Sequence, residues 1–271
     1  MPRVPIAPES VDLSGIRAWL FDLDGVLTPT ATVHRHAWAR LFRPYLESHG
    51  VAPYRDEADY FAYIDGKPRY DGVRDLLASR DLRIPEGDVA DSPDADTVHG
   101  LGNRKNEAFN ETLAEEGVAP YPASIAFLDA LHERGCLVAV VSSSKNAPAV
   151  LDAAGILDRF EIVVDGAVAA RESIPGKPAP DMFERAAELL GVDTAACAVV
   201  EDAESGIRAG AAGDFGIVVG VDRGVGRDAL AELGADVIVD ELDELIPAVE
   251  RTVPPAPAAA TSIDPDREDR A

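Results

Sequence analysis

The 271-residue sequence is short of positive charge, and above all of lysine. It carries 25 Lys and Arg against 49 Asp and Glu, which gives a formal net charge of −24. Nucleic acids and anionic membranes are bound through basic surfaces, so this balance argues against both as partners. It also repels an anionic substrate at long range, so a phosphate site would need local cations. Only four of the cations are lysines (Lys67, Lys105, Lys145 and Lys177), and either chance or a need for a compact point charge could explain each.

Cysteine and long apolar runs are scarce as well. Two cysteines, Cys136 and Cys197, abut apolar runs, and we expect them to be buried rather than joined in a disulfide framework. No apolar run approaches the roughly 20 residues that span a bilayer. The first residues, Met1-Pro2-Arg3-Val4-Pro5, lack the apolar core of a signal peptide. We therefore expect a monomeric cytoplasmic protein with no nucleic-acid or membrane partner.

Short apolar runs of strand length recur along the chain. They cover residues 18–23, 137–142, 162–164, 198–201, 216–219 and 237–239. From residue 122 onward they alternate with helix-like segments at 124–134, 147–154, 180–190 and 205–212. Such alternation predicts βαβ units, and hence an α/β protein with a Rossmann-like, doubly wound parallel sheet.

The stretch from 32 to 114 has a different pattern, with no comparable Val/Ile run. Its aromatic and leucine residues recur at helical intervals (Trp38, Leu41, Phe42, Tyr45, Tyr60, Phe61 and Leu76). We interpret it as a helical cap that covers the carboxyl ends of the strands, where doubly wound sheets bind ligands. The predicted division is a lead-in at 1–14, a catalytic core at 15–31 and 115–250, the cap at 32–114, and a disordered tail at 251–271. Residues 28–30 and 117–122 would be the two hinge segments.

The segment Trp19-Leu20-Phe21-Asp22-Leu23-Asp24-Gly25-Val26-Leu27 carries the strongest chemical signal. Alternation along a strand places Asp22 and Asp24 on one face. Two carboxylates this close repel each other unless a cation or a shared proton intervenes. The arrangement suits a reaction in which Asp22 attacks phosphorus, Asp24 handles a proton and a divalent metal lies between them. The alternative is an acidic strand end that solvates a turn.

Polar side chains follow three further strands. Ser142 begins the turn Ser142-Ser143-Ser144-Lys145-Asn146, which could hold a phosphate, although Ser142 could instead cap a helix. Lys177, in Gly176-Lys177-Pro178-Ala179-Pro180-Asp181, could neutralise phosphoryl oxygens or lie solvated in a loop. Glu201 and Asp202 end a buried run, and carboxylate oxygens are the ligands that Mg²⁺ prefers. Surface acids are the alternative there.

Together these motifs resemble the haloacid-dehalogenase-like phosphotransferase superfamily over residues 17–240, and VVSSSKN, GKPAPD and VEDAESGI resemble its β-phosphoglucomutase branch. The resemblance implies that Asp22 is the nucleophile and Asp24 the acid/base. It implies a phosphate site made by Ser142, Ser143, Lys145, Asn146 and Lys177. It also implies Mg²⁺ bound by Asp22, the main-chain carbonyl of Asp24, Asp202 and Glu201.

The same resemblance extends into the cap. It implies that Arg69 binds the distal substrate phosphate, that Gly66, Lys105 and Asn106 contact the sugar, and that His34 and Thr30 couple cap closure to the acid/base. Structural alternatives are a solvated helix face for Lys105 and a packed core position for His34. The sequence departs from the family pattern at Pro29, which replaces an acidic residue, and in the acidic segment 86–94, which does not align.

The predicted function is magnesium-dependent interconversion of β-glucose 1-phosphate and glucose 6-phosphate through the 1,6-bisphosphate, with a sugar phosphate as the small-molecule partner. A sugar-phosphate phosphatase that uses the same residues is the alternative. A non-catalytic sugar-phosphate sensor is a third reading, disfavoured because each core position carries a competent residue.

Overall fold

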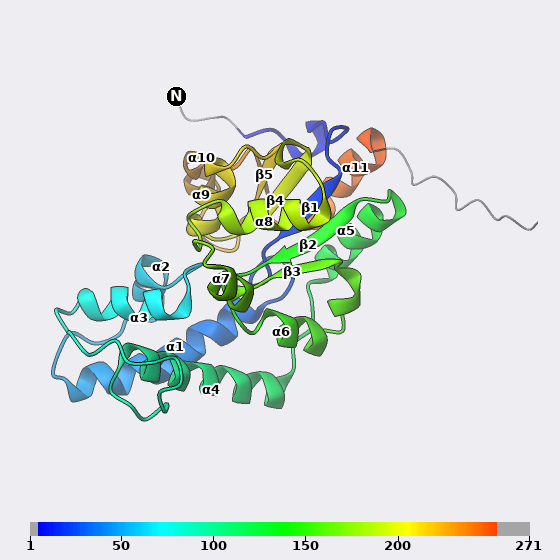
Figure 1. Ribbon diagram of the computed structural model, residues 1–271. Helices are drawn as coiled ribbons and strands as arrows, with labels where there is room; N and C mark the ends of the chain where they lie inside the picture. The colour runs from blue at the N-terminus through cyan, green and yellow to red at the C-terminus, as the bar shows by residue number, and fades with distance from the viewer. Residues whose placement is uncertain (1–4, 254–271) are drawn as a thin grey trace, which may run out of the picture.

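The computed structural model describes residues 5–253 and contains a six-stranded parallel sheet in the order β3-β2-β1-β4-β5-β6 (Figure 1). The predicted α/β, doubly wound class is confirmed. Every residue of β1 is buried because helices cover both faces of the sheet. The strands are β1 (Ala18–Phe21), β2 (Leu137–Val141), β3 (Ile162–Val164), β4 (Cys197–Glu201), β5 (Ile217–Val221) and β6 (Val237–Val239).

The pleat of β1 sends alternate side chains into two separate layers. Trp19 and Phe21 point to one face, where the Trp19 ring meets Phe127 edge-on with 5.0 Å between centroids. Leu20 points to the other face and packs in a cluster with Phe183. The first face is covered by α5 (Pro122–Glu133), α6 (Ala147–Ala153) and α11 (Ile246–Thr252). The second is covered by α7 (Gly166–Glu172), α8 (Asp181–Leu190), α9 (Glu204–Ala212) and α10 (Arg227–Leu233).

Four helices lie between β1 and α5 in the chain and gather at one end of the molecule, away from the sheet (Figure 1). They enclose their own apolar cluster, which includes Trp38, Phe42 and Leu76. Phe61 is an exception to the helical pattern, since 44% of it remains exposed. The helices are α1 (Thr30–Ser48), α2 (Ala58–Tyr63), α3 (Arg69–Ala78) and α4 (Val98–Glu116).

The described ends of the chain pack against the sheet domain. Ile6 forms a parallel bridge with Val237, and Val11 and Leu13 are buried in the core, so much of the predicted lead-in is part of the fold. Helix α11 continues to Thr252, past the expected start of the tail, and residues 254–271 lie outside the described range. The remaining short elements are 3-10 turns at Pro8–Ser10, Leu157–Arg159, Thr194–Ala196 and Leu242–Leu245.

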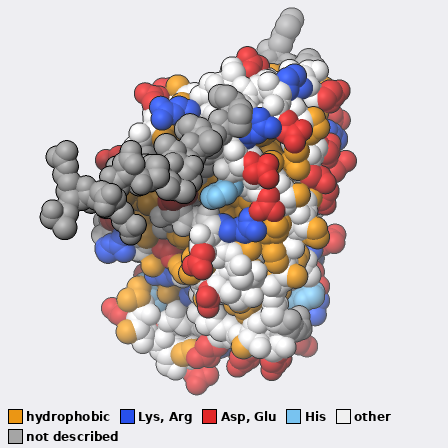
Figure 2. Space-filling model, turned by 90° about the vertical axis from the view of Figure 1, so that its right-hand side faces the viewer, with side chains coloured by type: hydrophobic (Ala, Val, Ile, Leu, Met, Phe, Trp, Pro, Cys, Tyr) orange, Lys and Arg blue, Asp and Glu red, His pale blue; other side chains and the backbone are white. Residues whose placement is uncertain are grey.

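The surface reflects the acidic composition. Acidic side chains spread over the face shown in Figure 2, with fewer Lys and Arg side chains among them. Both cysteines are free and buried, as predicted. Within residues 5–253, none of the helices has the length and apolar character to cross a membrane.

Candidate active site

An acidic cluster lies where β1 and β4 end. Because these two parallel strands are neighbours in the sheet, Asp22, one residue past β1, comes close to Glu201 and Asp202 at the end of β4. One carboxylate oxygen of each of the three residues lies within 4.8 Å of the others. Burial raises the pKa of Asp22 and, together with the charges of Glu201 and Asp22, that of Asp202. These carboxylates are therefore costly to hold side by side without a cation.

Lys177 supplies part of the positive charge that these carboxylates need. Its Nζ donates hydrogen bonds to Asp22 Oδ1 at 2.5 Å, Glu201 Oε1 at 2.7 Å and the Val141 carbonyl at 2.9 Å. Although burial on its own would lower the pKa of Lys177, the Asp22 and Glu201 carboxylates raise it above its usual range. The side chain is 1% exposed, so the alternative of a solvated loop lysine is wrong.

The donor set at this cluster fits a divalent cation. Asp22 and Asp202 present carboxylates, and the backbone turn between them is close, since a Cβ on Gly25 would lie 1.9 Å from Asp202 Oδ2. Glu201 has less to offer, because Lys177 takes Oε1 and the amides of Asp202 and Ala203 donate to Oε2 at 2.9 and 3.0 Å. In this arrangement Glu201 holds Lys177 and the loop, while Asp22 and Asp202 are the better-placed ligands. The surface-acid reading fails for Glu201, which is 1% exposed.

Asp24 faces the hinge and the cap rather than this cluster. Thr30 Oγ1 donates to Asp24 Oδ1, and His34 Nε2 lies 3.5 Å from the same oxygen. Thr30 is itself held by Thr28, whose hydroxyl is 2.8 Å away. Burial raises the pKa of Asp24. A carboxyl with a raised pKa retains a proton more readily, as a general acid must.

Behind His34 lies Lys105, from α4. Lys105 Nζ is 2.5 Å from His34 Nδ1 and sits over the rings of Trp38 and Phe109, at 5.3 and 4.9 Å from their centroids. Burial lowers the pKa of Lys105 to about 7 and that of His34 well below its usual value. Lys105 is 3% exposed, so it does not lie on a solvated helix face. His34 is packed, as the structural alternative expected, with its ring stacked on Phe109 at 4.1 Å between centroids. Its position near Asp24 leaves the predicted coupling of cap closure to the acid/base a prediction.

The serine turn after β2 meets the cap. Ser142 Oγ accepts a hydrogen bond from the Ser144 amide at 3.1 Å, and Asn146, not Ser142, precedes α6 as its cap residue. Ser143 Oγ donates to the Gly66 carbonyl at 3.0 Å. Gly66 has φ +68°, and a Cβ there would come within 1.8 Å of Ser205 Oγ. The cap loop thus docks on the core at a point where only glycine fits.

Three predicted residues form a polar bridge between cap and core. Asn106 Oδ1 accepts hydrogen bonds from Arg69 at 2.8 Å and from Asn146 Nδ2 at 2.7 Å. Lys145 Nζ lies 5.6 Å from the centre of the Tyr70 ring. Across residues 5–253, no carboxylate forms an ion pair with Arg69 or Lys145. Both cations are therefore available to an anion.

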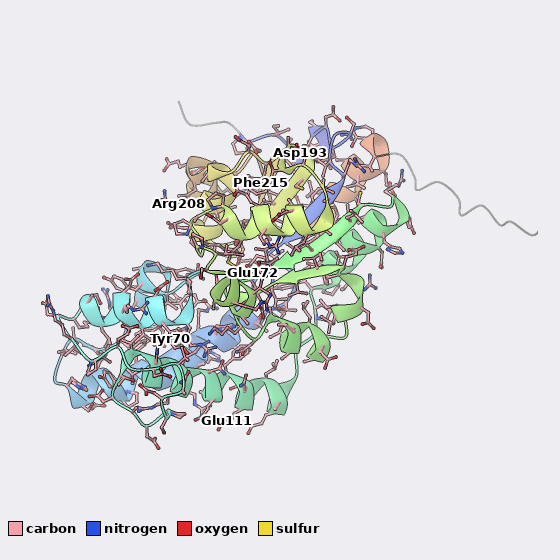
Figure 3. All side chains as sticks on the ribbon, in the orientation of Figure 1. Tyr70, Glu111, Glu172, Asp193, Arg208 and Phe215 are labelled. Carbon is pink, nitrogen blue, oxygen red and sulfur yellow. The ribbon has the colours of Figure 1, made fainter. Side chains whose placement is uncertain are left out.

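One cavity of about 440 Å³ lies between the cap and the sheet, and most of the predicted site residues line it. Thr30, Asn106, Asn146 and Lys177 are not among its lining residues and act on it through their neighbours. Lys67, Lys105 and Lys145 line it, and Lys177 binds Asp22 on its wall, so the four lysines gather at a single site. In Figure 3, the labels Tyr70 and Glu172 mark the cap and the core, the two parts of the molecule between which the cavity lies. Sequence reasoning did not assign many of the lining residues to the site, among them Trp38, Tyr60, Asp65 and Tyr70. For two of these residues the sequence did carry a signal: Asp65 directly precedes Gly66, and Tyr70 directly follows Arg69.

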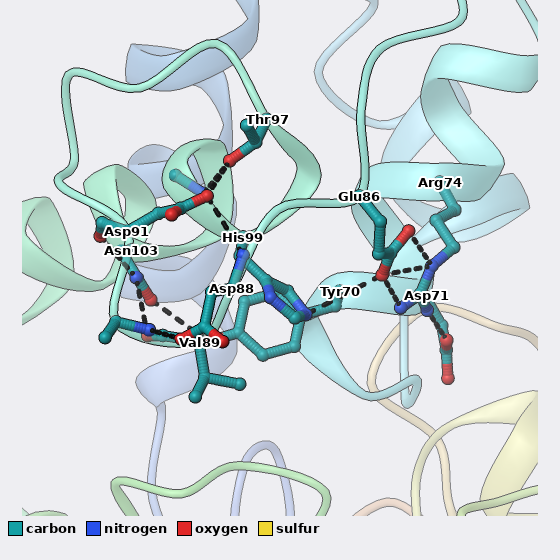
Figure 4. A network of polar contacts seen from close by, with 12 residues as sticks. Tyr70, Asp71, Arg74, Glu86, Asp88, Val89, Asp91, Thr97, His99 and Asn103 are labelled. Atoms are coloured by element: carbon teal, nitrogen blue, oxygen red, sulfur yellow. Dashed lines mark hydrogen bonds and ion pairs between the residues drawn. The ribbon is translucent and has the colours of Figure 1, made fainter.

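The acidic segment 86–94, which did not align, forms a loop that polar contacts join to the helices of the cap (Figure 4). The Asn103 amide donates to the carbonyls of Val89 and Asp91 at 3.1 and 2.9 Å, and Thr97 Oγ1 donates to Asp91 Oδ2 at 2.6 Å. These bonds hold Val89 at the wall of the cavity, although 60% of it is exposed. The Tyr70 hydroxyl donates to Asn103 Oδ1 at 3.0 Å, which ties the loop to the helix that carries Arg69.

The chain is similar in sequence and fold to known proteins. Residues 16–214 match the family model described as haloacid dehalogenase-like hydrolase. The chain is 49% identical over 242 residues to a β-phosphoglucomutase of Mycobacterium tuberculosis, covering 85% of this chain and 92% of the relative. It is 31% identical over 198 residues to hexitol phosphatase A of Escherichia coli, covering 72% and 79%. A solved β-phosphoglucomutase from Clostridium difficile gives a TM-score of 0.69 at 26% identity, covering 85% of this chain and 93% of that one. The chain therefore belongs to the haloacid dehalogenase-like hydrolase family.

Proposed function

We propose that this enzyme is a magnesium-dependent phosphomutase of sugar phosphates that interconverts β-glucose 1-phosphate and glucose 6-phosphate through the 1,6-bisphosphate. The observation that carries the proposal is the presence of cations at both ends of one cavity. Lys177 lies at the acidic end beside Asp22, and Arg69 and Lys145 lie where the cap meets the serine turn. A bisphosphate needs two such ends, because one phosphate must be held while the other reacts.

Arg69 is suited to the distal end because none of the carboxylates that the structure describes forms an ion pair with it. It is partly buried, and burial lowers the pKa of its guanidinium. Its polar side-chain partner is the neutral oxygen of Asn106. A buried cation that faces neutral partners is costly to keep unless an anion binds to it, and a planar guanidinium can take two phosphate oxygens at once. These features support Arg69 as a distal phosphate ligand.

The chemistry proposed for the acidic end uses two carboxyl groups. A carboxylate oxygen of Asp22 forms a bond to phosphorus as the bond from phosphorus to the departing sugar oxygen breaks. The proton of Asp24 passes to that oxygen, and Asp24 later accepts the proton of the acceptor hydroxyl when the phosphoryl group returns. Lys177 and the amides of the serine turn stabilise charge on the transferring group. Bound Mg²⁺, held by Asp22, Asp202 and the Asp24 carbonyl, would supply further charge neutralisation.

Hydrolysis at the same site is the second candidate, favoured by the similarity to a hexitol phosphatase. The two reactions differ in whether water or a sugar hydroxyl reaches the phosphorylated Asp22. Ser143 and Ser205 donate hydrogen bonds to the cap loop and hold it against the core beside Asp22, a contact that favours exclusion of water and hence the mutase.

Arg69→Ala separates the two candidates. In the mutase, we expect glucose 6-phosphate formation, primed with the 1,6-bisphosphate, to fall by about a hundredfold or more, because the distal phosphate loses its anchor. Hydrolysis of a small aryl phosphate should fall far less. Arg74→Ala is the matched control, since Arg74 lies on the same helix and pairs with Glu86 at the surface. A wild-type enzyme that releases phosphate and forms no glucose 6-phosphate would overturn the mutase proposal in favour of the phosphatase.

A further inference from the structure

Arg223, two residues past β5, reaches the turn that carries the catalytic pair. Its Nε donates a hydrogen bond to the carbonyl of Gly25 at 2.9 Å. Gly25 directly follows Asp24 in the chain. An arginine from a separate strand end is therefore bonded to the main chain beside the proposed acid/base.

The guanidinium is itself fixed in place. Its two terminal nitrogens donate to the two oxygens of Glu241 at 2.7 and 3.0 Å, and one of them also donates to the Asp240 carbonyl at 3.0 Å. The side chain is 20% exposed. A bidentate pair leaves an arginine little rotational freedom, so Nε is held at a defined point in front of Gly25.

Gly25 is itself held by close contacts on two sides. Its amide donates to the Thr28 carbonyl at 2.7 Å, and its φ of +90° suits glycine. Its Cα abuts Asp202, since a Cβ would lie 1.9 Å from Oδ2 and 2.5 Å from Cγ of that carboxylate. A shift of Gly25 would consequently move the Asp24 main chain on one side and the Asp202 carboxylate on the other.

The guanidinium of Arg223 also contacts the segment through which the chain returns from the cap to the core. It lies 4.2 Å from the centre of the Tyr121 ring, and Tyr121 precedes α5. The Tyr121 amide donates to the Leu27 carbonyl at 2.9 Å, and Ser124 Oγ donates to the Val26 carbonyl at 2.7 Å. Arg223 thus contacts the turn at Gly25, which precedes the first hinge segment, and Tyr121 in the second.

We propose that Arg223 is a positioning residue for the phosphoryl transfer proposed above, on which this inference rests. By fixing the Gly25 carbonyl and the Tyr121 ring, it holds the Asp24 main chain and the Asp202 carboxylate at the spacing that the metal and the reacting phosphate require. It does not touch substrate. Its loss should therefore lower turnover and magnesium affinity while the substrate-binding groups of the cap remain in place.

The test compares Arg223→Met and Arg223→Lys with Arg227→Met. Arg227 is the matched control because it also pairs with an acid of the β6 end, Asp240 at 2.8 Å, and donates to a carbonyl, that of Ile238, at 2.6 Å. None of its described contacts reaches Gly25 or Tyr121. Three quantities are measured for each protein: kcat and KM for para-nitrophenyl phosphate, the Kd for Mg²⁺ by calorimetry without substrate, and Tm.

We expect Arg223→Met to lower kcat about tenfold or more, with KM changed less than about threefold, and to weaken Mg²⁺ binding. Arg223→Lys should recover part of kcat, because an ammonium group can still donate to the Gly25 carbonyl. Arg227→Met should match the wild type in kcat and Kd. Equal kcat and Mg²⁺ Kd in Arg223→Met and Arg227→Met would overturn the inference and leave Arg223 with a role in stability alone. A wild type without phosphatase or mutase activity would refute the proposed function instead, and the Mg²⁺ comparison would still decide the role of Arg223.

Discussion

The two ends of the cavity handle positive charge in opposite ways. At the sheet end, Lys177 is buried among carboxylates of the chain itself, bonding to both Asp22 and Glu201. At the cap end, Arg69 and Lys105 make their closest polar contacts with neutral groups, Asn106 and His34. Lys177 compensates part of the negative charge at the sheet end before substrate arrives, whereas the cap end gains its counter-charge from what binds. The comparison indicates that the core holds the reacting groups in place before substrate binds, whereas the cap presents cations that pair only with a bound anion.

The largest expected effect comes from removing the nucleophile at the sheet end. Asp22→Asn should abolish both mutase and aryl phosphatase activity, because an amide cannot form the phosphorylated intermediate. The measurement is turnover of both substrates with a verified, folded variant, checked by its Tm. Activity near that of the wild type would remove Asp22 from the nucleophile role.

Next in size is loss of the compensating cation. Lys177→Met leaves Asp22 and Glu201 facing each other in a buried site, and breaking a buried pair in this way costs about 3–5 kcal/mol of stability. We expect Tm to fall and activity toward both substrates to drop by about a thousandfold. Lys67→Met is the control, since the Lys67 pair with Asp75 is more exposed. A Lys177→Met protein as stable as the control would show that the two ends do not differ as described.

A smaller effect should follow from cutting the polar bridge at the cap end. Asn146→Ala removes one of the two donors to Asn106, which also accepts from Arg69. We expect glucose 6-phosphate formation to fall about tenfold, with less change in aryl phosphate hydrolysis, because only the distal phosphate loses support. Parallel assays of the two activities measure the ratio. An equal loss in both would place Asn146 at the reacting phosphate.

The smallest effect is a pH dependence of stability due to Lys105. Burial lowers the pKa of Lys105 to about 7 from the usual 10.5, so above pH 7 the unfolded state binds its proton more tightly than the folded state. The contribution of Lys105 to stability should therefore rise from pH 7 to about 10 and level off below pH 7. Urea midpoints across this range should show a shallower rise for Lys105→Met than for the wild type. Superimposable curves would mean that Lys105 titrates normally.

Sequence reasoning reached the acidic end because its residues lie directly after strands. Parallel strands end at the same edge, so polar residues that follow apolar runs, such as Asp22, Ser142 and Glu201, must meet there. The same reasoning could not decide which oxygens of Glu201 remain available, because that depends on the amides of Asp202 and Ala203. The ligand role of Glu201 stays a prediction.

The cap end was less predictable, since its contacts join positions far apart in the chain. Asn106 meets Asn146, and Gly66 meets Ser143, only when the helices of the cap are oriented on the core. No local pattern encodes that orientation. The role of Arg223 could not be predicted for another reason. Arg223 bonds a main-chain carbonyl, which every residue has, so the amino-acid type of its partner gives no indication of the contact.

The gathering of the four lysines at one cavity has a consequence for chemical labelling. Reagents that acylate amines attack the unprotonated, accessible amino group, and in most proteins they scatter over the surface. Here Lys105 and Lys177 are buried, Lys67 is engaged with Asp75, and Lys145 is exposed on the cavity wall. Amine acylation of the lysines should therefore fall chiefly on Lys145 and, for a reagent small enough to enter the cavity, on Lys105, whose pKa is lowered to about 7. Its rate would report whether the cavity is filled.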